Sequence, residues 1–421
     1  MMKKKAIYVI KILVLGFFIY RVFSSFGFVV SEALNYPLGS FDFQWDSAKL
    51  FSMRMNPYLE TLFHIYPNGN MYEKYYGPIT CNQFPSMICL LLPYTLFDPI
   101  TAKFAWLISN GVFIVCISIG LSMTVFKGKP LLDKLIWNIM WIGSVPLFIT
   151  IGNGQHLLFS FSGFIFSIAI CEKAEKVLSG NDHKNNVLWI VAGILLGISY
   201  FKYTVTAVTV LYFIYRKWWK PIFVSLGMHA ILTIFSAYWI DSDIIEMFRD
   251  SLMISAKTGE AGYIDMMTLF GNGIVYKIIV ILMALLMFYF SFTLKNKDEN
   301  AFLSLLISVS LIIVYHRSYD YFVMIVPAFW LFDHMIRNRR KMCKYELLLI
   351  ILLLTGIWIV FFDKAVIYHF IKLNDELWEK IRYVFSVIGS YLSVLYMIYY
   401  EFSSGNTEVD ANPHQSAGHA G

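Results

Sequence analysis

The sequence contains 421 residues, of which 58% are hydrophobic and 15% are charged, and its formal net charge is +6. Soluble globular proteins carry about 25% charged residues, so this composition excludes an ordinary soluble domain. Apolar stretches of roughly 18 or more residues recur without alternation of apolar and polar positions, which predicts an all-α polytopic membrane protein and excludes a barrel. The positive charge lies in short loops and does not indicate nucleic-acid binding.

The first apolar stretch follows three lysines and extends from about residue 6 to residue 30. It is too long for the hydrophobic region of a signal peptide and lacks a small-residue cleavage site, so we predict a retained membrane helix. Along the whole chain we predict about 12 transmembrane helices, within a range of about 11–13. The predicted spans are 6–30, 101–126, 134–151, 155–172, 187–201, 203–216, 220–240, 273–294, 301–315, 319–336, 345–362 and 379–400.

Basic and acidic residues separate between alternate connections of these spans. With the N-terminus in the cytoplasm, the connections on that side carry Lys127, Lys129, Lys134, Lys173, Lys176, Lys184, Arg216, Lys217, Lys220, Lys295, Lys297, Arg337, Arg339, Arg340, Lys341 and Lys344. The opposite connections carry Glu32, Asp42, Asp46, Glu60, Glu73, Asp241, Asp243, Glu246, Asp250, Glu260 and Asp265. This asymmetry satisfies the positive-inside rule and predicts a multi-pass cell-membrane protein with both termini in the cytoplasm.

Two segments decide this topology. Phe84–Phe97 is apolar but short and contains Pro85 and Pro93, so we predict a juxtamembrane or re-entrant helix packed on protein. The chain breaks again at Lys202, and a single crossing over 187–216 would invert the second half of the map. The basic cluster at 216–220 favours a return to the cytoplasmic side.

Two long outer segments follow, at about 31–100 and 241–272. In the second, Ile244, Ile245, Phe248 and Leu252 share one helical face, which predicts a helix on the membrane surface. We interpret residues 1–400 as one membrane domain. The polar residues 401–421 are predicted to form a disordered cytoplasmic tail.

The first outer loop carries a candidate catalytic base. Asp42 lies in the run Ser40-Phe41-Asp42-Phe43-Gln44-Trp45-Asp46, whose aromatic rings favour the membrane interface. A base that activates a hydroxyl must be ionised and held beside its substrate. Asp46 lies four residues further on and points the same way if this stretch is helical. The alternative is that both are solvated loop acids or helix caps.

Two further parts of the sequence carry candidate cationic site residues. Lys202 ends an apolar helix, where burial at membrane depth costs about 2.5–3.5 kcal/mol and calls for an anionic partner. Alternatively, its ammonium reaches up to the lipid headgroups. His316, Arg317 and Asp320 lie within five residues at an outer membrane edge, a set that suits a phosphate and a sugar. The alternative is a charged turn with an Arg–Asp pair.

The run Gly152-Asn153-Gly154-Gln155-His156 predicts a tight turn on the same outer side. Gln155 and His156 would open the next helix and either face a cavity or cap that helix. Asp42, Gln155, Lys202 and His316/Arg317, together with the loop at 241–272, come from distant parts of the chain. The topology brings them to one membrane face, which favours an outer-face site for an anionic lipid.

With these residues assembled, the chain resembles the GT-C superfamily of integral-membrane glycosyltransferases. Within it, the chain looks closest to the α-mannosyltransferases and arabinofuranosyltransferases that use polyprenyl-phosphate sugars. The matching positions, over roughly residues 10–340, are Asp42, Asn56-Pro57-Tyr58, the helix from Phe84-Pro85 to Pro93, Gly154-Gln155, Gly193 to Lys202, and Asp320. The chain departs from that group at 316–321, where the group often has a Ser-Pro-x-Ser-Trp-Asp/Glu-His-like stretch.

This resemblance implies a GT-C-like helix bundle with juxtamembrane helices in the first outer loop. It implies transfer of a sugar, with mannose favoured, from a polyprenyl-phosphate donor to a lipid or glycan acceptor on the outer face, with inversion. Asp42 would be the general base and Asp46 a possible second acid. Lys202, Arg317 and His316 would bind the donor phosphate, and Tyr58, Gln155, His156 and Asp320 would line the site.

Some GT-C enzymes use a divalent metal. The sequence has no clear ligand cluster for one, although Asp42 and Asp46 could bind a metal. Two other functional classes remain open. One is a transporter or flippase of a lipid-linked sugar, disfavoured by the absence of a visible inverted repeat and by the long first outer loop. The other is a structural subunit of an envelope-assembly complex, which leaves the outer polar residues unexplained.

Overall fold

A computed structural model of the chain describes residues 2–35, 43–59, 81, 83–177, 182–257, 265–294, 298–362 and 375–406. Over these residues every regular element is a helix, and none is a strand. This confirms the all-α polytopic class that the long apolar stretches predicted. A chain in lipid must satisfy its backbone hydrogen bonds internally, and a helix does so within one segment.

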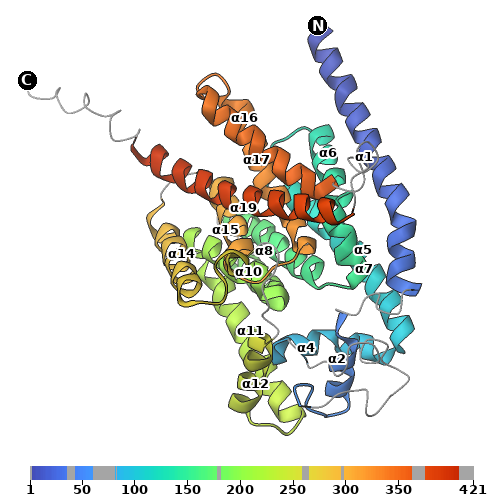
Figure 1. The fold of residues 1–421 in the computed structure, drawn as a ribbon. Helices are drawn as coiled ribbons and strands as arrows, with labels where there is room; N and C mark the ends of the chain where they lie inside the picture. Colours follow the sequence, from blue (N-terminus) through green and yellow to red (C-terminus); the bar gives the residue numbers. More distant parts are fainter. Residues whose placement is uncertain are drawn as a thin grey trace, which may run out of the picture.

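The helices are drawn in Figure 1, with α1 leading in from the N-terminus and α19 near the C-terminus. In chain order they are α1 (Met2–Asn35), α2 (Trp45–Ser52), α4 (Pro85–Leu91), η3 (Leu92–Leu96), α5 (Pro99–Met123), α6 (Leu131–Ile142), α7 (Val145–Asn153), α8 (Leu157–Val177), α9 (Asp182–Ser199), η4 (Tyr200–Lys202), α10 (Tyr203–Tyr215), α11 (Trp219–Trp239), α12 (Ile244–Lys257), α13 (Met266–Phe270), α14 (Ile274–Thr293), α15 (Glu299–Ile313), η5 (Ser318–Met324), α16 (Ile325–Asn338), α17 (Lys344–Phe362) and α19 (Asp375–Asn406).

Fewer helices than predicted are long and apolar enough to cross a membrane alone. Within the described residues there are seven, or up to eight if α6 and α7, bent by 53°, form one span. The sequence predicted about twelve. The difference arises because α15 and the apolar part of α19 are short, α16 has only 14 residues, and residues 186–215 form one continuous apolar stretch.

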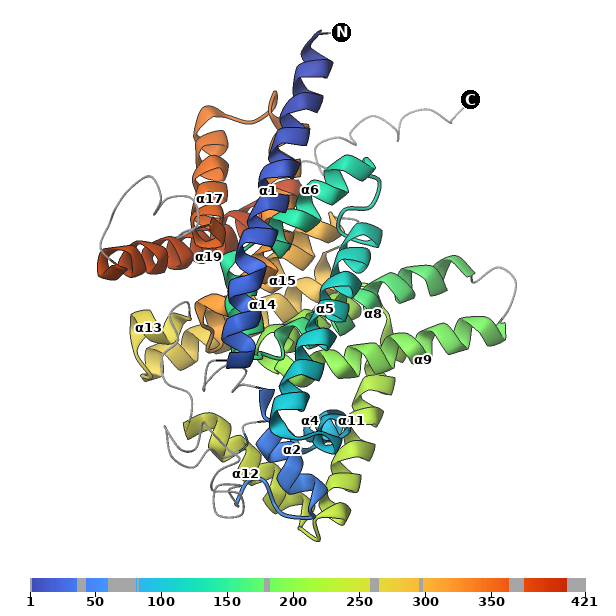
Figure 2. The ribbon, with the colours of Figure 1, turned by 90° about the vertical axis from the view of Figure 1, so that its right-hand side faces the viewer.

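That stretch does not run straight, because contacts show that it folds back at η4. The backbone N–H of Lys202 donates to the Ser160 hydroxyl near the start of α8, at 2.7 Å. Arg216, just after α10, pairs with Glu175 near the end of α8, at 2.7 Å. Helix α10 therefore runs parallel to α8. Helix α9 runs antiparallel to α8, because Ser167 contacts Ala192 while Gly163 lies against Leu195, and Figure 2 shows α8 and α9 side by side. The chain returns over 203–216, as the basic cluster predicted.

Ion pairs join several of the basic connections at one end of the bundle. Lys127 pairs with Glu172, and Arg216 also pairs with Glu299. Lys129 and Arg337 both pair with Asp333. We call these residues, with Glu175, the basic end. The chain segments that were predicted to share one membrane side therefore lie together in space.

The opposite end carries a cap made of α2, α4, η3 and α12 (Figure 1). Here α4 and η3 cover only 12 residues, and α4 packs against α11 while η3 packs against α2 and α5. The Ser86 hydroxyl lies 2.9 Å from Nδ1 of His229, and the Ser236 hydroxyl donates to the Pro85 carbonyl at 3.0 Å. The segment predicted to be juxtamembrane is thus a short, broken helix held against protein.

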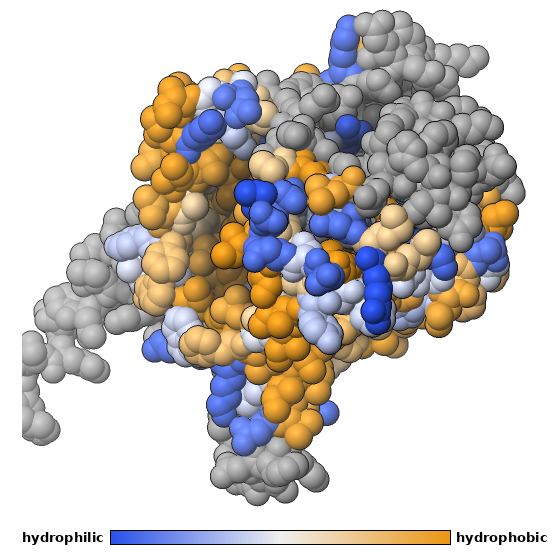
Figure 3. All heavy atoms as spheres, turned by 90° about the horizontal axis from the view of Figure 1, so that it is seen from below, coloured by the Kyte–Doolittle hydropathy of each residue, from blue (hydrophilic) through white to orange (hydrophobic). Residues whose placement is uncertain are grey.

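Helix α12 completes the cap and exposes an apolar face. Met247 and Ser251 are buried, whereas Ile245, Phe248 and Leu252 are exposed. This is the face that the spacing predicted for a helix on the membrane surface. Seen from the cap end, polar side chains gather near the centre and a larger apolar surface lies beside them (Figure 3).

Candidate functional site

The site is built around a turn between α7 and α8. Helix α7 ends at Asn153, and Gly154 caps it in the left-handed conformation with φ of 72°, where a glycine costs least. The indole N–H of Trp106 donates to the Gly154 carbonyl at 3.0 Å, which fastens the turn to α5. Gln155 and His156 follow and are buried at the head of α8. The sequence predicted this tight turn and its two polar residues.

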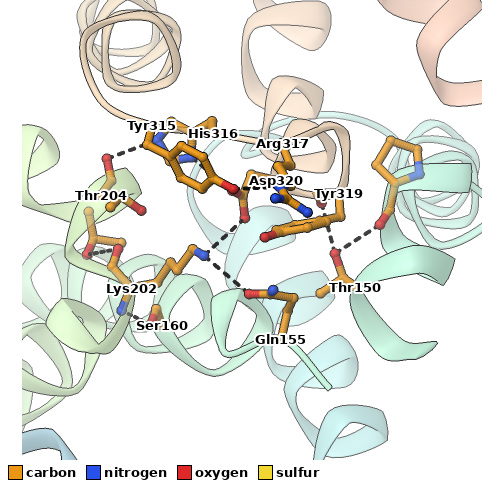
Figure 4. A network of polar contacts seen from close by, with 12 residues as sticks. Thr150, Gln155, Ser160, Lys202, Thr204, Tyr315, His316, Arg317, Tyr319 and Asp320 are labelled. Atoms are coloured by element: carbon orange, nitrogen blue, oxygen red, sulfur yellow. Dashed lines mark hydrogen bonds and ion pairs between the residues drawn. The ribbon is translucent and has the colours of Figure 1, made fainter. Parts of the chain in front are cut away.

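Lys202 approaches the turn from the junction of α9 and α10 (Figure 4). Its ammonium donates to Oε1 of Gln155 at 3.2 Å and lies 3.8 Å from Oδ1 of Asp320. It also lies 5.5 Å from the centre of the Tyr319 ring. The side chain is 16% exposed, so one part of it remains open. Three residues that are far apart in sequence therefore converge on one point.

Asp320 is buried and its two carboxylate oxygens differ. Oδ2 lies 2.9 Å from Nδ1 of His316. Oδ1 faces Lys202 at the longer distance and, among the described residues, has no hydrogen-bond donor. The carboxylate is thus fixed on one side by the imidazole and held loosely on the other by the ammonium. An under-satisfied buried carboxylate is costly, which makes this a strained part of the fold.

His316 has acceptors at both ring nitrogens. Nε2 lies 3.1 Å from the Thr204 carbonyl, while Nδ1 faces Asp320. A neutral imidazole has one N–H, so both contacts are hydrogen bonds only if the ring is protonated or Asp320 carries the proton. That His316 binds the donor phosphate stays a prediction. Neither ring nitrogen points to open space, and the residue is fully buried.

Arg317 and Asp265 complete the surroundings. Arg317 is exposed, and its Nε donates to the Tyr315 hydroxyl. Asp265, just before α13, is buried and lies 3.4 Å from the backbone nitrogen of His316. Sequence reasoning counted Asp265 only as one of many outer acids. No local motif distinguishes it, so its contact with this cluster becomes visible only in the fold.

The first outer loop reaches the same turn through Phe43. The Phe43 carbonyl lies 3.0 Å from Nε2 of His156, and its ring stacks on Trp106 at 4.7 Å. Asp42, the residue before it, lies outside the described residues. Gln44 adopts the left-handed conformation with φ of 58°, and α2 begins only at Trp45. The stretch from 43 to 46 is therefore not one continuous helix, and the condition under which Asp42 and Asp46 would point the same way is not met.

The other predicted residues lie in the cap. Asp46 is half-buried in the first turn of α2. Tyr58 is buried, and its hydroxyl donates to the Gln83 carbonyl at 2.7 Å. Burial raises the pKa of the Tyr58 phenol well above its usual value, so the group stays protonated as a donor. The structure does not bring Tyr58 to the Lys202 cluster, and its contact with substrate stays a prediction.

No group of three or more histidine, cysteine, aspartate or glutamate side chains suited to a metal ion occurs in the part of the chain that the structure describes. This leaves the suggested pair of Asp42 and Asp46 untested, because Asp42 lies outside that part. The lysine and arginine side chains of the cluster suit an anionic ligand.

Several helices long and apolar enough to span a membrane, together with a buried polar cluster, define a polytopic membrane protein. Residues 85–316, more than half of the chain, match the model of Glycosyltransferase family 87. The chain belongs to this family and is a membrane glycosyltransferase of GT-C-like type. The matched region contains Gln155, His156, Lys202 and His316. No curated protein and no solved structure matches the chain.

Proposed function

We propose that the enzyme transfers a sugar, with mannose favoured, from a polyprenyl-phosphate donor to a lipid or glycan acceptor, with inversion. The observation that supports this is the convergence of Lys202, Gln155 and Asp320 beside the chain segment that follows Asp42. The ammonium of Lys202 is held by one amide and one distant carboxylate. It can therefore turn toward a phosphate without breaking a close ion pair.

In the proposed reaction, the Asp42 carboxylate removes the proton from an acceptor hydroxyl. The hydroxyl oxygen attacks the anomeric carbon from the face opposite the phosphate. The bond from that carbon to the phosphate oxygen breaks, and its electron pair leaves with polyprenyl phosphate. Lys202 and the exposed Arg317 stabilise the growing negative charge of the phosphate, which needs little acid assistance.

His316 and Asp320 have a positioning role in this proposal. Thr204 and Asp320 hold the imidazole on both sides. Asp320 in turn orients the Lys202 ammonium toward the space beside Gln155. A protonated His316 would add a further positive charge behind the carboxylate, so that the cluster as a whole attracts an anion.

We further propose that the cap faces the outer side and the basic end faces the cytoplasm, with residues 1–400 forming one membrane domain. The ion pairs that join the basic connections support this orientation. Helix α19 continues to Asn406, and residues 407–421, which belong to the predicted disordered tail, lie outside the described residues.

The test is product analysis. Purified protein in nanodiscs is incubated with labelled polyprenyl-phosphate mannose and a panel of lipid and glycan acceptors. We expect a mannosylated product whose anomeric configuration is inverted relative to the donor. Transfer only from a nucleotide sugar, or retention of configuration, would overturn the proposal. Transfer of another sugar from a polyprenyl-phosphate donor would correct the sugar and leave the mechanism in place.

A further inference from the structure

Arg21 lies inside the first apolar helix, and no acidic side chain pairs with it among the described residues. The part of α1 that is long and apolar enough to cross the membrane covers Lys5–Ser31. At a rise of 1.5 Å per residue, Arg21 lies about 15 Å from the end of this part at Ser31. Its Nε is buried and has no hydrogen-bond partner in the described ranges. A charge at this depth is costly unless an anion compensates it.

The Arg21 side chain begins at the surface where α1 packs against α6 (Figure 2). Phe18, about one turn earlier on the same side of α1, is buried. The Cβ of Arg21 lies 3.8 Å from the position that a Cβ would take at Gly143, directly after α6. Lys11 forms an ion pair with Asp133 near the start of α6, so the two helices run in the same direction. This packing holds Arg21 beside the end of α6.

The chain breaks at this point, because α6 and α7 are bent by 53°. Ser144 stands at the N-cap of α7, but its hydroxyl makes no cap hydrogen bond. Its Oγ is buried and has no partner in the part of the chain that the structure describes. The first N–H groups of a helix have no intrahelical partner, and a serine cap commonly satisfies one of them. The bend therefore presents an uncapped helix start at membrane depth, next to an unpaired arginine.

We propose that Arg21, Ser144 and the amino end of α7 bind the phosphate group of a membrane lipid. A guanidinium binds phosphate oxygens at two points, and the start of a helix attracts an anion. Helix α1 exposes apolar side chains such as Leu13 and Phe23, so a phosphate can arrive there on a lipid chain. The site is separate from the one at Lys202, which lies beyond the other end of α7, about 12 Å along its axis.

The experiment measures binding and not transfer. Delipidated full-length protein in dodecyl maltoside, a detergent without phosphate, is titrated with radiolabelled farnesyl phosphate. Every sample carries Lys202→Met, which weakens the site at the other end of α7. We expect one bound farnesyl phosphate, and Arg21→Gln should lower its affinity about tenfold. Lys11→Gln is the matched control on the same helix, because the Lys11 charge is already paired with Asp133, and it should leave the affinity unchanged.

A second variant guards against misfolding. Ser144→Ala removes one hydroxyl and no charge, so it should keep the melting temperature and weaken binding about two- to fivefold. Unchanged affinity in both Arg21→Gln and Ser144→Ala would overturn the proposal. Loss of all binding in Lys202→Met alone would overturn it as well, since the two sites would then be one.

Competitors identify the source of the phosphate. Farnesol, which has the chain without the phosphate, should not displace farnesyl phosphate, and equal displacement would overturn the proposal. Displacement by phosphatidylglycerol would support it and show that a phospholipid headgroup also fits. Inorganic phosphate that displaces the probe as strongly as unlabelled farnesyl phosphate would overturn the assignment to a lipid.

Discussion

Helix α10 carries a cation at each end, and the two have different surroundings. Arg216 lies at its C-terminus and contacts Glu299 at 2.6 Å and Glu175 at 2.7 Å, with the Trp218 ring 4.4 Å away. Lys202 lies at its N-terminus, 3.2 Å from an uncharged amide and 3.8 Å from a carboxylate. Arg216 is saturated by close anionic partners. Within the described residues, the Lys202 ammonium has one hydrogen bond and one longer contact with a carboxylate, so it can donate further hydrogen bonds to a ligand.

This difference suggests that Arg216 has a structural role and that Lys202 is available to bind a ligand. Two carboxylates at hydrogen-bonding distance hold a guanidinium in one geometry and tie α8, α10 and α15 together. An ammonium has three donors, and among the described residues Lys202 makes one close side-chain hydrogen bond, to Gln155. The ammonium lies 3.8 Å from Oδ1 of Asp320, which is longer than a hydrogen bond. Helix α10 thus has a structural ion-pair cluster at one end and a candidate phosphate-binding lysine at the other.

The largest expected effect comes from the base. Asp42→Asn should lower the rate of glycosyl transfer by about 10²–10⁴-fold, because the amide is nearly isosteric and cannot accept a proton. Expression and the melting temperature should stay near wild type. Asp46→Asn is the matched control and should be milder, since Asp46 lies within α2. Transfer at the wild-type rate in Asp42→Asn would exclude Asp42 as the base.

The comparison within α10 predicts the next effect. Lys202→Met keeps the apolar stem and removes the charge, so the donor KM should rise about tenfold or more, since a charge-assisted contact is worth about 1.5–3 kcal/mol. The acceptor KM should change little. Arg216→Met should instead lower the melting temperature and leave the donor KM within about twofold, because Arg216 lies at the far end of α10 from the site and its charge is balanced by Glu175 and Glu299. The reverse pattern would contradict the division of roles.

A smaller effect is expected at Arg317. Arg317→Lys keeps the charge and loses the planar fork that binds phosphate at two points, so the donor KM should rise about three- to tenfold. Arg54→Lys is the control, because Arg54 is exposed and lies over the Trp239 ring in the cap, at 4.6 Å. Equal donor KM values in both variants would mean that Arg317 does not contact the phosphate.

The last prediction concerns orientation and involves no change in activity. In a cysteine-free background, Arg340→Cys and Glu246→Cys introduce single thiols at exposed positions beyond the basic end and in the cap. A membrane-impermeant maleimide should label the first only from the cytoplasmic side and the second only from outside. Lys129→Cys should react like Arg340→Cys. Labelling of both Arg340→Cys and Glu246→Cys from one side would contradict the proposed topology.

The sequence by itself determined the fold class, the turn at Gly154 and the amphipathic character of α12. These features depend on local properties: long apolar stretches, a glycine where φ is positive, and spacing along one helix. The return of the chain at Lys202 was also foreseeable, because membrane insertion responds to the basic cluster that follows at 216–220. Such signals are contained in short windows of the chain.

Only the tertiary structure decided which polar groups meet and how. The sequence contained Lys202, Gln155 and Asp320 but no sign that one Asp320 carboxylate oxygen would lack a donor within the described part of the chain. It did not show that His316 is enclosed by Thr204 and Asp320, nor that Asp265 reaches that residue. These contacts join residues up to 118 positions apart, as Lys202 and Asp320 are. Distances of a few tenths of an ångström decide whether a side chain is saturated or available. Packing sets such distances, and no local pattern encodes them.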